Sequence, residues 1–91
     1  MEVFQIIWDL PEEPEGNIQY VAEHDVTPEE VDEVLRSPTS RTDVTRTTGR
    51  EITFGYTSEG RYIAVIWHRV IDDPLTVRPI TAFEVPKPRG L

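Results

Sequence analysis

The sequence predicts an α+β fold: an antiparallel sheet of about four strands with two helices packed on one face, in the order β-α-α-β-β-β. Three observations predict it. A strong helix start lies in the first half, a shorter segment with helical spacing precedes it, and three closely spaced β-like segments fill the second half. The 91 residues allow a single domain, which we place at residues 1–85, followed by a tail over residues 86–91.

The first expected element is an apolar strand at residues 3–8. This segment is rich in β-forming residues and is apolar on both of its alternating faces, which predicts a strand buried centrally in the sheet. An acidic loop with Pro and Gly follows it. Ile18, Val21 and Ala22 then have helical spacing, so we expect a short helix of about two turns here.

The second helix has an unusually complete start signal. Thr27 is a side-chain acceptor at the N-cap position, Pro28 suits the first helical position, and Glu30 completes a capping box. Val26 and Val31 occupy the two positions of a hydrophobic staple, which fixes the angle at which the chain enters the helix. This local chemistry also sets the direction of the residues just before the helix.

The second half is expected to form a meander of strands. Residues 39–49 are polar, which predicts a loop or an exposed edge strand around Val44. Three strands are then expected, at residues 50–57, 61–70 and 75–85. The turns between them are short, so neighbouring strands must pair antiparallel, and the first strand is expected to be inserted into this meander or added alongside it. Pro79 cannot donate a ladder hydrogen bond, which predicts that the last strand lies at an edge or is bulged there.

Composition excludes several classes of function. The chain has no cysteine, so it has no disulfide, thiolate metal site or thiol nucleophile. No apolar run approaches the roughly 20 residues of a spanning helix and no secretory signal is recognisable, so we expect a soluble, cytoplasmic protein without membrane contact. The net charge of −8 opposes nonspecific nucleic-acid binding, but residues 1–45 carry −10 and residues 46–91 carry +2. An anion site is therefore expected in the second half.

The candidate chemistry rests on one histidine and several arginines. There is no phosphate-binding glycine loop, zinc-ligand spacing or nucleophile elbow, so we expect neither a cofactor nor a metal. What remains is a set of five residues: His24, Arg50, Arg61, Arg69 and Arg78. Such a set suits RNA cleavage, in which arginines neutralise phosphate charge and a histidine or carboxylate moves the proton of the 2′-hydroxyl. The alternative is structural: a hydrogen-bonded histidine, and arginines paired with the plentiful carboxylates.

Other polar and aromatic residues in the strands have two readings as well. His68 fits the end of a strand better than a catalytic position. Phe54, Tyr56, Tyr62 and Trp67 are expected to pack in the core or across strands, and the alternative is a sheet surface on which bases stack.

Four short motifs follow the order found in BrnT-type toxins: Trp8-Asp9, EHDVTPEEV at residues 23–31, GYTSEGR at 55–61 and RPITA at 78–82. The resemblance covers most of residues 4–85. It implies a RelE-type fold and a metal-independent endoribonuclease of a type II toxin–antitoxin system, with RNA as the substrate. In that reading His24 shuttles the proton, Arg61 and Arg78 clamp the phosphate, and Glu23 substitutes as a base.

The chain departs from the BrnT pattern at positions that carry charge. The family typically has lysine and glycine where this chain has Glu23 and Asp25, and an arginine where it has Phe83. The second hypothesis is therefore a non-catalytic protein–protein interaction module on the same scaffold. Its acidic helices would bind an antitoxin or another basic protein. Homo-oligomers are also expected, because so short a chain buries only about 60–65% of its unfolded surface.

Overall fold

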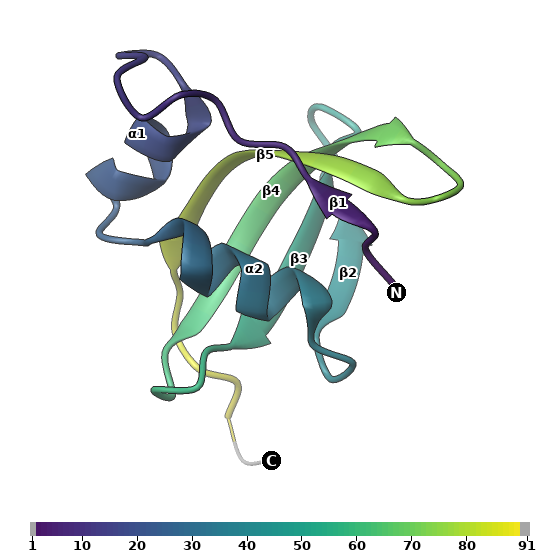
Figure 1. Cartoon of the computed structure of the whole chain (residues 1–91). Coiled ribbons are helices and arrows are strands. Elements are labelled where there is room, and N and C mark those ends of the chain that lie inside the picture. Colours follow the sequence, from purple (N-terminus) through teal and green to yellow (C-terminus); the bar gives the residue numbers. More distant parts are fainter. Residues whose placement is uncertain (1, 90–91) are drawn as a thin grey trace.

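A computed structural model describes residues 2–89 as an α+β arrangement of two helices and a five-stranded mixed sheet (Figure 1). The elements in chain order are β1 (Gln5–Ile6), α1 (Asn17–Glu23), α2 (Pro28–Arg36), β2 (Arg41–Val44), β3 (Glu51–Tyr56), β4 (Tyr62–Ile71) and β5 (Thr76–Glu84). The strand order across the sheet is β1-β5-β4-β3-β2. The β2-β3, β3-β4 and β4-β5 pairs are antiparallel, and β1 pairs with β5 in parallel.

The α+β class and the two helices are confirmed, but the number and order of strands differ from the prediction. The fifth strand is β2, the exposed edge strand expected as one alternative around Val44. Of the two placements expected for the first strand, central burial is wrong and addition alongside the meander is confirmed: β1 is a two-residue parallel strand at the edge. The apolar residues of this segment have another role: Val3 enters the core, and Ile6 and Trp8 pack against it. Phe4 is the exception, with 65% of its surface exposed.

The last strand, β5, is internal and bulged. It lies between β1 and β4, so the expected edge position is wrong. The expected bulge is confirmed, since the register with β4 passes from Ile66↔Thr81 to Trp67↔Pro79 and leaves Ile80 without a partner. This irregularity lets a residue without an N–H occupy a fully buried position inside the sheet.

Both helices contribute to one core on one side of the sheet. Val21 of α1 joins Val31, Val34 and Leu35 of α2, and all four are fully buried. From the sheet, the core includes Ile63, Val65, Trp67, Val77 and Ala82. In Figure 1, α2 crosses in front of β3 and β4 while α1 lies beside β5. No helix within residues 2–89 packs on the other side, which we call the open face.

Gly55 allows α2 to approach the sheet closely. A Cβ atom at this position would lie 3.2 Å from Cγ1 of Val34 and would overlap the Ser40 hydroxyl. The glycine therefore sits where a helix side chain and the chain leading into β2 meet the strand, and it has a packing role.

Two expectations concern the membrane and the C-terminal tail. The helices have seven and nine residues, and neither is long and apolar enough to cross a bilayer. Residues 86–89 carry no helix or strand, and the remaining two residues of the predicted tail lie outside the described part of the chain.

Candidate functional site

His24 lies in the tight link between the two helices and is the C-cap of α1. Two hydrogen bonds close this helix end: the N–H of Asp25 donates to the carbonyl of Ala22 over 3.0 Å, and the N–H of Val26 donates to the carbonyl of Val21 over 3.0 Å. This is the Schellman pattern, completed by the burial of Val21 and Val26 in the core. The capping box of α2 follows directly, so the backbone on both sides of His24 is held by local bonds.

The Schellman turn requires a left-handed residue, and Asp25 supplies it with φ = 61°. We expect Asp25→Gly to raise the free energy of unfolding by about 0.5 kcal/mol, because glycine adopts this conformation without a Cβ penalty. Urea denaturation of the variant measures the change. Asp25→Asn keeps a side chain and removes the charge, so it separates the backbone effect from the electrostatic one. A glycine variant less stable than the parent would contradict the prediction.

The His24 side chain is exposed and rests against β5. Its ring meets that of Phe83 edge-on, with 5.9 Å between the ring centroids. Glu23, the last residue of α1, is also exposed. Each of the two side chains thus has access to solvent.

Arg61 is held by two carboxylates. Its Nη1 donates to Glu30 Oε2 over 2.7 Å and to Oε1 over 2.9 Å, and its Nη2 donates to Glu84 Oε1 over 3.2 Å. The hydrogen bonds from Glu30 raise the pKa of the Arg61 guanidinium above its usual value, and Glu84 adds to this effect. Glu30 also accepts the backbone N–H of Thr27 in the capping box. The guanidinium is therefore directed at the N-terminus of α2, where its charge is already compensated.

Arg78 belongs to a second network that anchors α1. Its Nη2 donates to the Asp9 carboxylate, which also accepts the backbone N–H of Asn17 over 2.9 Å. That backbone hydrogen bond lowers the pKa of the Asp9 carboxyl; burial opposes the shift, and Arg78 reinforces it. Asp9 thus caps the first turn of α1, where the N-cap residue Gly16 has no side chain to do so.

Asn17 is the centre of this network. Its side-chain oxygen accepts the N–H of Asp9 over 2.8 Å, and its Nδ2 donates to the carbonyls of Ile7 and Pro79 over 3.0 and 2.9 Å. The residue is 1% exposed and joins the segment after β1, the start of α1 and the bulge of β5. The sequence carries no local signal for this role, because no motif marks an asparagine whose partners lie in three segments.

His24 and Arg61 contact consecutive residues of β5, whose side chains point to opposite faces of the sheet, and Arg78 lies farther along the same strand. His24 contacts Phe83, and the neighbouring Glu84 binds Arg61. Arg78 lies five residues before Phe83 on β5, which corresponds to about 16 Å along an extended strand. The two arginines therefore face different carboxylates at different positions along the sheet.

The other arginine candidates are not gathered at this end. Arg69 binds Glu51 over 2.8 Å and lies over the ring of Trp67, and the hydrogen bonds to Glu51 raise the pKa of its guanidinium. Arg50 is exposed, as is His68, which pairs across the sheet with Arg78. Within residues 2–89, no three His, Asp or Glu side chains converge as metal ligands.

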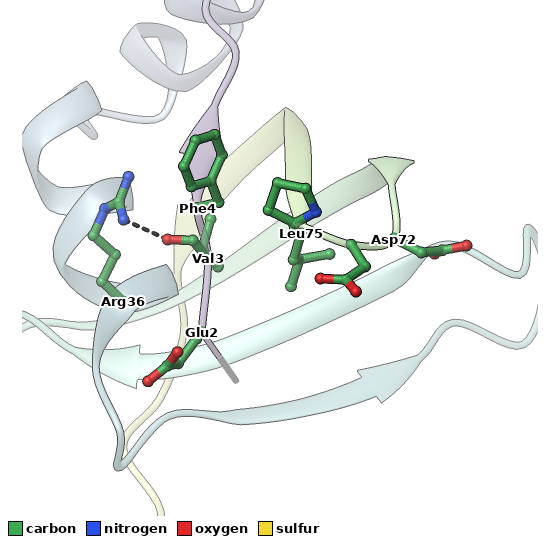
Figure 2. A pocket seen from close by; sticks show the side chains of 8 residues that line it. Glu2, Val3, Phe4, Arg36, Asp72 and Leu75 are labelled. Carbon is green, nitrogen blue, oxygen red and sulfur yellow. Dashed lines mark hydrogen bonds between the residues drawn. The ribbon is translucent and has the colours of Figure 1, made fainter.

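Two surface hollows have acidic walls. The β1 hollow, of about 640 Å³, is lined by Glu2, Val3, Phe4, Arg36, Asp72, Asp73, Pro74 and Leu75. Figure 2 shows Glu2, Phe4, Leu75 and Asp72 around it, with the Arg36 guanidinium bonded to the carbonyl of Val3. The α1 hollow, of about 390 Å³, is lined by Trp8, Asp9, Leu10, Glu13, Glu15 and Gly16. In both hollows carboxylates stand beside an exposed apolar side chain, which is Phe4 in the first and Leu10 in the second.

Comparisons with protein-family models, curated proteins and solved structures gave no match to this chain. The resemblance to BrnT-type toxins therefore stays a prediction from the four short motifs.

Proposed function

We propose that this protein is an interaction module that binds a basic partner protein through an acidic surface around α1. The acidic surface consists of Glu12, Glu13, Glu15, Glu23, Asp25 and Glu29. One observation carries the proposal: all six side chains are exposed, and none of them forms an ion pair with another residue of the described range 2–89. The candidate phosphate ligands Arg61 and Arg78, in contrast, are each bound to a carboxylate.

The electrostatics of the isolated chain disfavour this acidic surface. Glu23 lies in the last turn of α1 and Asp25 directly after it, where carboxylates oppose the helix dipole. No Lys or Arg occurs between residues 12 and 35, so repulsion among these acids has no local compensation. A cationic partner relieves the repulsion, and the uneven charge also accelerates its association.

The α1 hollow offers a place where such a partner would be anchored. Glu13 and Glu15 are exposed at its wall, while Asp9 is occupied by Arg78. Leu10 is 61% exposed and Trp8 is half-buried against the core. A partner segment with a Lys or Arg followed by an apolar residue would match this arrangement, because its cation would meet the carboxylates and its apolar side chain would meet Leu10 and Trp8.

RNA cleavage on the same scaffold is the competing proposal, and the exposed His24 is the observation that favours it. Cleavage would require Arg61 and Arg78 to exchange their carboxylate partners for phosphate oxygens. It would also require an anionic substrate to approach past Glu23 and Asp25, which flank His24. The charge distribution therefore supports the interaction module over the nuclease.

A binding titration tests the proposal. A labelled amphipathic peptide rich in Lys and Arg is titrated with the protein by fluorescence anisotropy, and we expect affinity that falls as salt increases. Glu13→Lys at the α1 hollow is expected to weaken binding about tenfold. Glu59→Lys has the same change of charge in the exposed turn between β3 and β4, and serves as the matched control.

Equal weakening by the two variants would mean that only net charge matters, which contradicts a defined acidic surface. RNA cleavage by the purified protein, abolished by His24→Ala, would replace the module with the nuclease.

A further inference from the structure

The open face of the sheet is an uncovered surface with regular apolar rows. In the first row Phe54, Ala64 and Phe83 lie side by side on β3, β4 and β5, with Arg41 of β2 at the end. In the next row Ile52, Ile66 and Thr81 lie side by side, with Asp43 at the end. Residues paired across antiparallel strands point to the same side, so both rows belong to the open face.

Aromatic side chains cluster at one end of this face. The rings of Tyr56 and Tyr62 are 4.7 Å apart between centroids, and those of Phe54 and Tyr62 are 6.2 Å apart. The Arg41 guanidinium lies over the Phe54 ring at 5.6 Å. Tyr56 is 47% exposed, while Phe54 and Tyr62 are half-buried. Of the four aromatic residues considered as a stacking surface, three therefore lie on the open face, while Trp67 is buried in the core.

From this geometry we infer that the open face is the interface of a symmetric dimer, with a second copy of this chain as its occupant. The net charge of −8 does not oppose contact between the two rows, because their only charged residues, Arg41 and Asp43, form a neutral pair. The acidic surface belongs to α1 and its flanking segments, and it borders the first row at Phe83, whose ring contacts His24. The uncharged rows are thus where two acidic chains meet with the least repulsion.

The charge pattern of β2 is self-complementary. Arg41 and Asp43 point to the same side two residues apart, their side chains are 72% and 65% exposed, and 3.8 Å separates the nearest charged atoms. A two-fold axis across the strands at the level of Thr42 places Arg41 of each copy opposite Asp43 of the other. The same operation packs the row of Phe54 onto the partner's row of Ile52, in the aligned sheet-on-sheet geometry with about 10 Å between sheets.

The size of the face sets the expected strength. Four strands at about 4.8 Å spacing and six residues at about 3.3 Å rise cover roughly 400 Å² per copy in projection. The total of about 800 Å² is below the roughly 1,200 Å² of standard stable interfaces. We therefore expect a weak, concentration-dependent dimer with a dissociation constant on the order of 10–100 µM.

Sedimentation velocity over about 5–500 µM protein tests the dimer directly, and a charge swap tests its geometry. Asp43→Arg places like charges opposite each other twice, so we expect the dimer dissociation constant to rise about tenfold or more. Arg41→Asp places two negative charges opposite each other twice, and it is expected to weaken the dimer in the same way. The double variant Arg41→Asp/Asp43→Arg restores complementarity and is expected to dimerise like the parent. Both positions are exposed, and circular dichroism checks that each variant is folded.

Glu59→Arg has the same charge change as Asp43→Arg but lies in a turn away from the rows, and it is expected to leave dimerisation intact or to strengthen it. A protein that stays monomeric at every concentration overturns the proposal and assigns the open face to a different protein. A dimer that neither single variant weakens, or that the double variant fails to restore, overturns the two-fold arrangement.

Discussion

Replacing Asn17 with leucine is expected to lower the free energy of unfolding by about 3 kcal/mol. The substitution removes the acceptor of the Asp9 N–H and the donors to the carbonyls of Ile7 and Pro79. Asn17 is 1% exposed, so water cannot replace these bonds without opening the contact of α1 with β5. The loss would be a large fraction of the stability of so small a domain.

Urea denaturation followed by circular dichroism measures the loss. Gln19→Leu is the matched control, because it makes the same kind of change in the same helix at a side chain whose hydrogen bond to Pro11 is exposed. We expect the control to change the stability by less than about 0.5 kcal/mol. Equal effects of the two substitutions would mean that the Asn17 network does not hold α1 on the sheet.

Replacing Glu30 with alanine is expected to lower the free energy of unfolding by about 2–3 kcal/mol. Glu30 is only 9% exposed and has two functions: it completes the capping box with Thr27, and it binds Arg61 through both oxygens. Its removal leaves the Thr27 N–H without its acceptor and leaves Arg61 with Glu84 alone.

The control for this variant is Glu29→Ala, an exposed acid in the same first turn of α2, with an expected loss of about 0.5 kcal/mol from the helix dipole. Thermal or chemical denaturation compares the two. The ion pair has no structural role if Glu30→Ala is as mild as Glu29→Ala.

The second helix and the three central strands are the parts of the fold that sequence reasoning predicted well. The start of α2 depends on contacts among residues 26–31, which are the capping box and the two valines of the staple. All of them are neighbours in the chain, so the local sequence is enough to predict this helix start. The β3-β4-β5 meander follows from turns too short for any other connection. The central burial predicted for the first strand was wrong because its partner Thr76 is distant in the chain and no local pattern encodes a parallel edge pair.

The candidate site shows the same division. His24, Arg61 and Arg78 were identified by residue type and motif, but their partners lie far away in sequence. Arg61 binds Glu30, 31 positions earlier, and Arg78 binds Asp9, 69 positions earlier. An acidic chain offers many carboxylates to each arginine, and composition cannot say which of them is near. The sequence predicted that both helices cover one face of the sheet, but it did not show which residues line the other face, because the same alternation of residues describes a covered and an uncovered side.

The sequence by itself determined the α+β class, both helices, the antiparallel pairing of the central strands and the acidic character of the first half. These properties depend on capping, periodicity, turn length and charge, which act over a few residues or add up along the chain. Only the tertiary structure decided the edge position of β1, the carboxylates that bind Arg61 and Arg78, and which face of the sheet stays uncovered. Each of these depends on which distant segments meet, and that is settled by burial of the whole core and by pairing of its few polar groups.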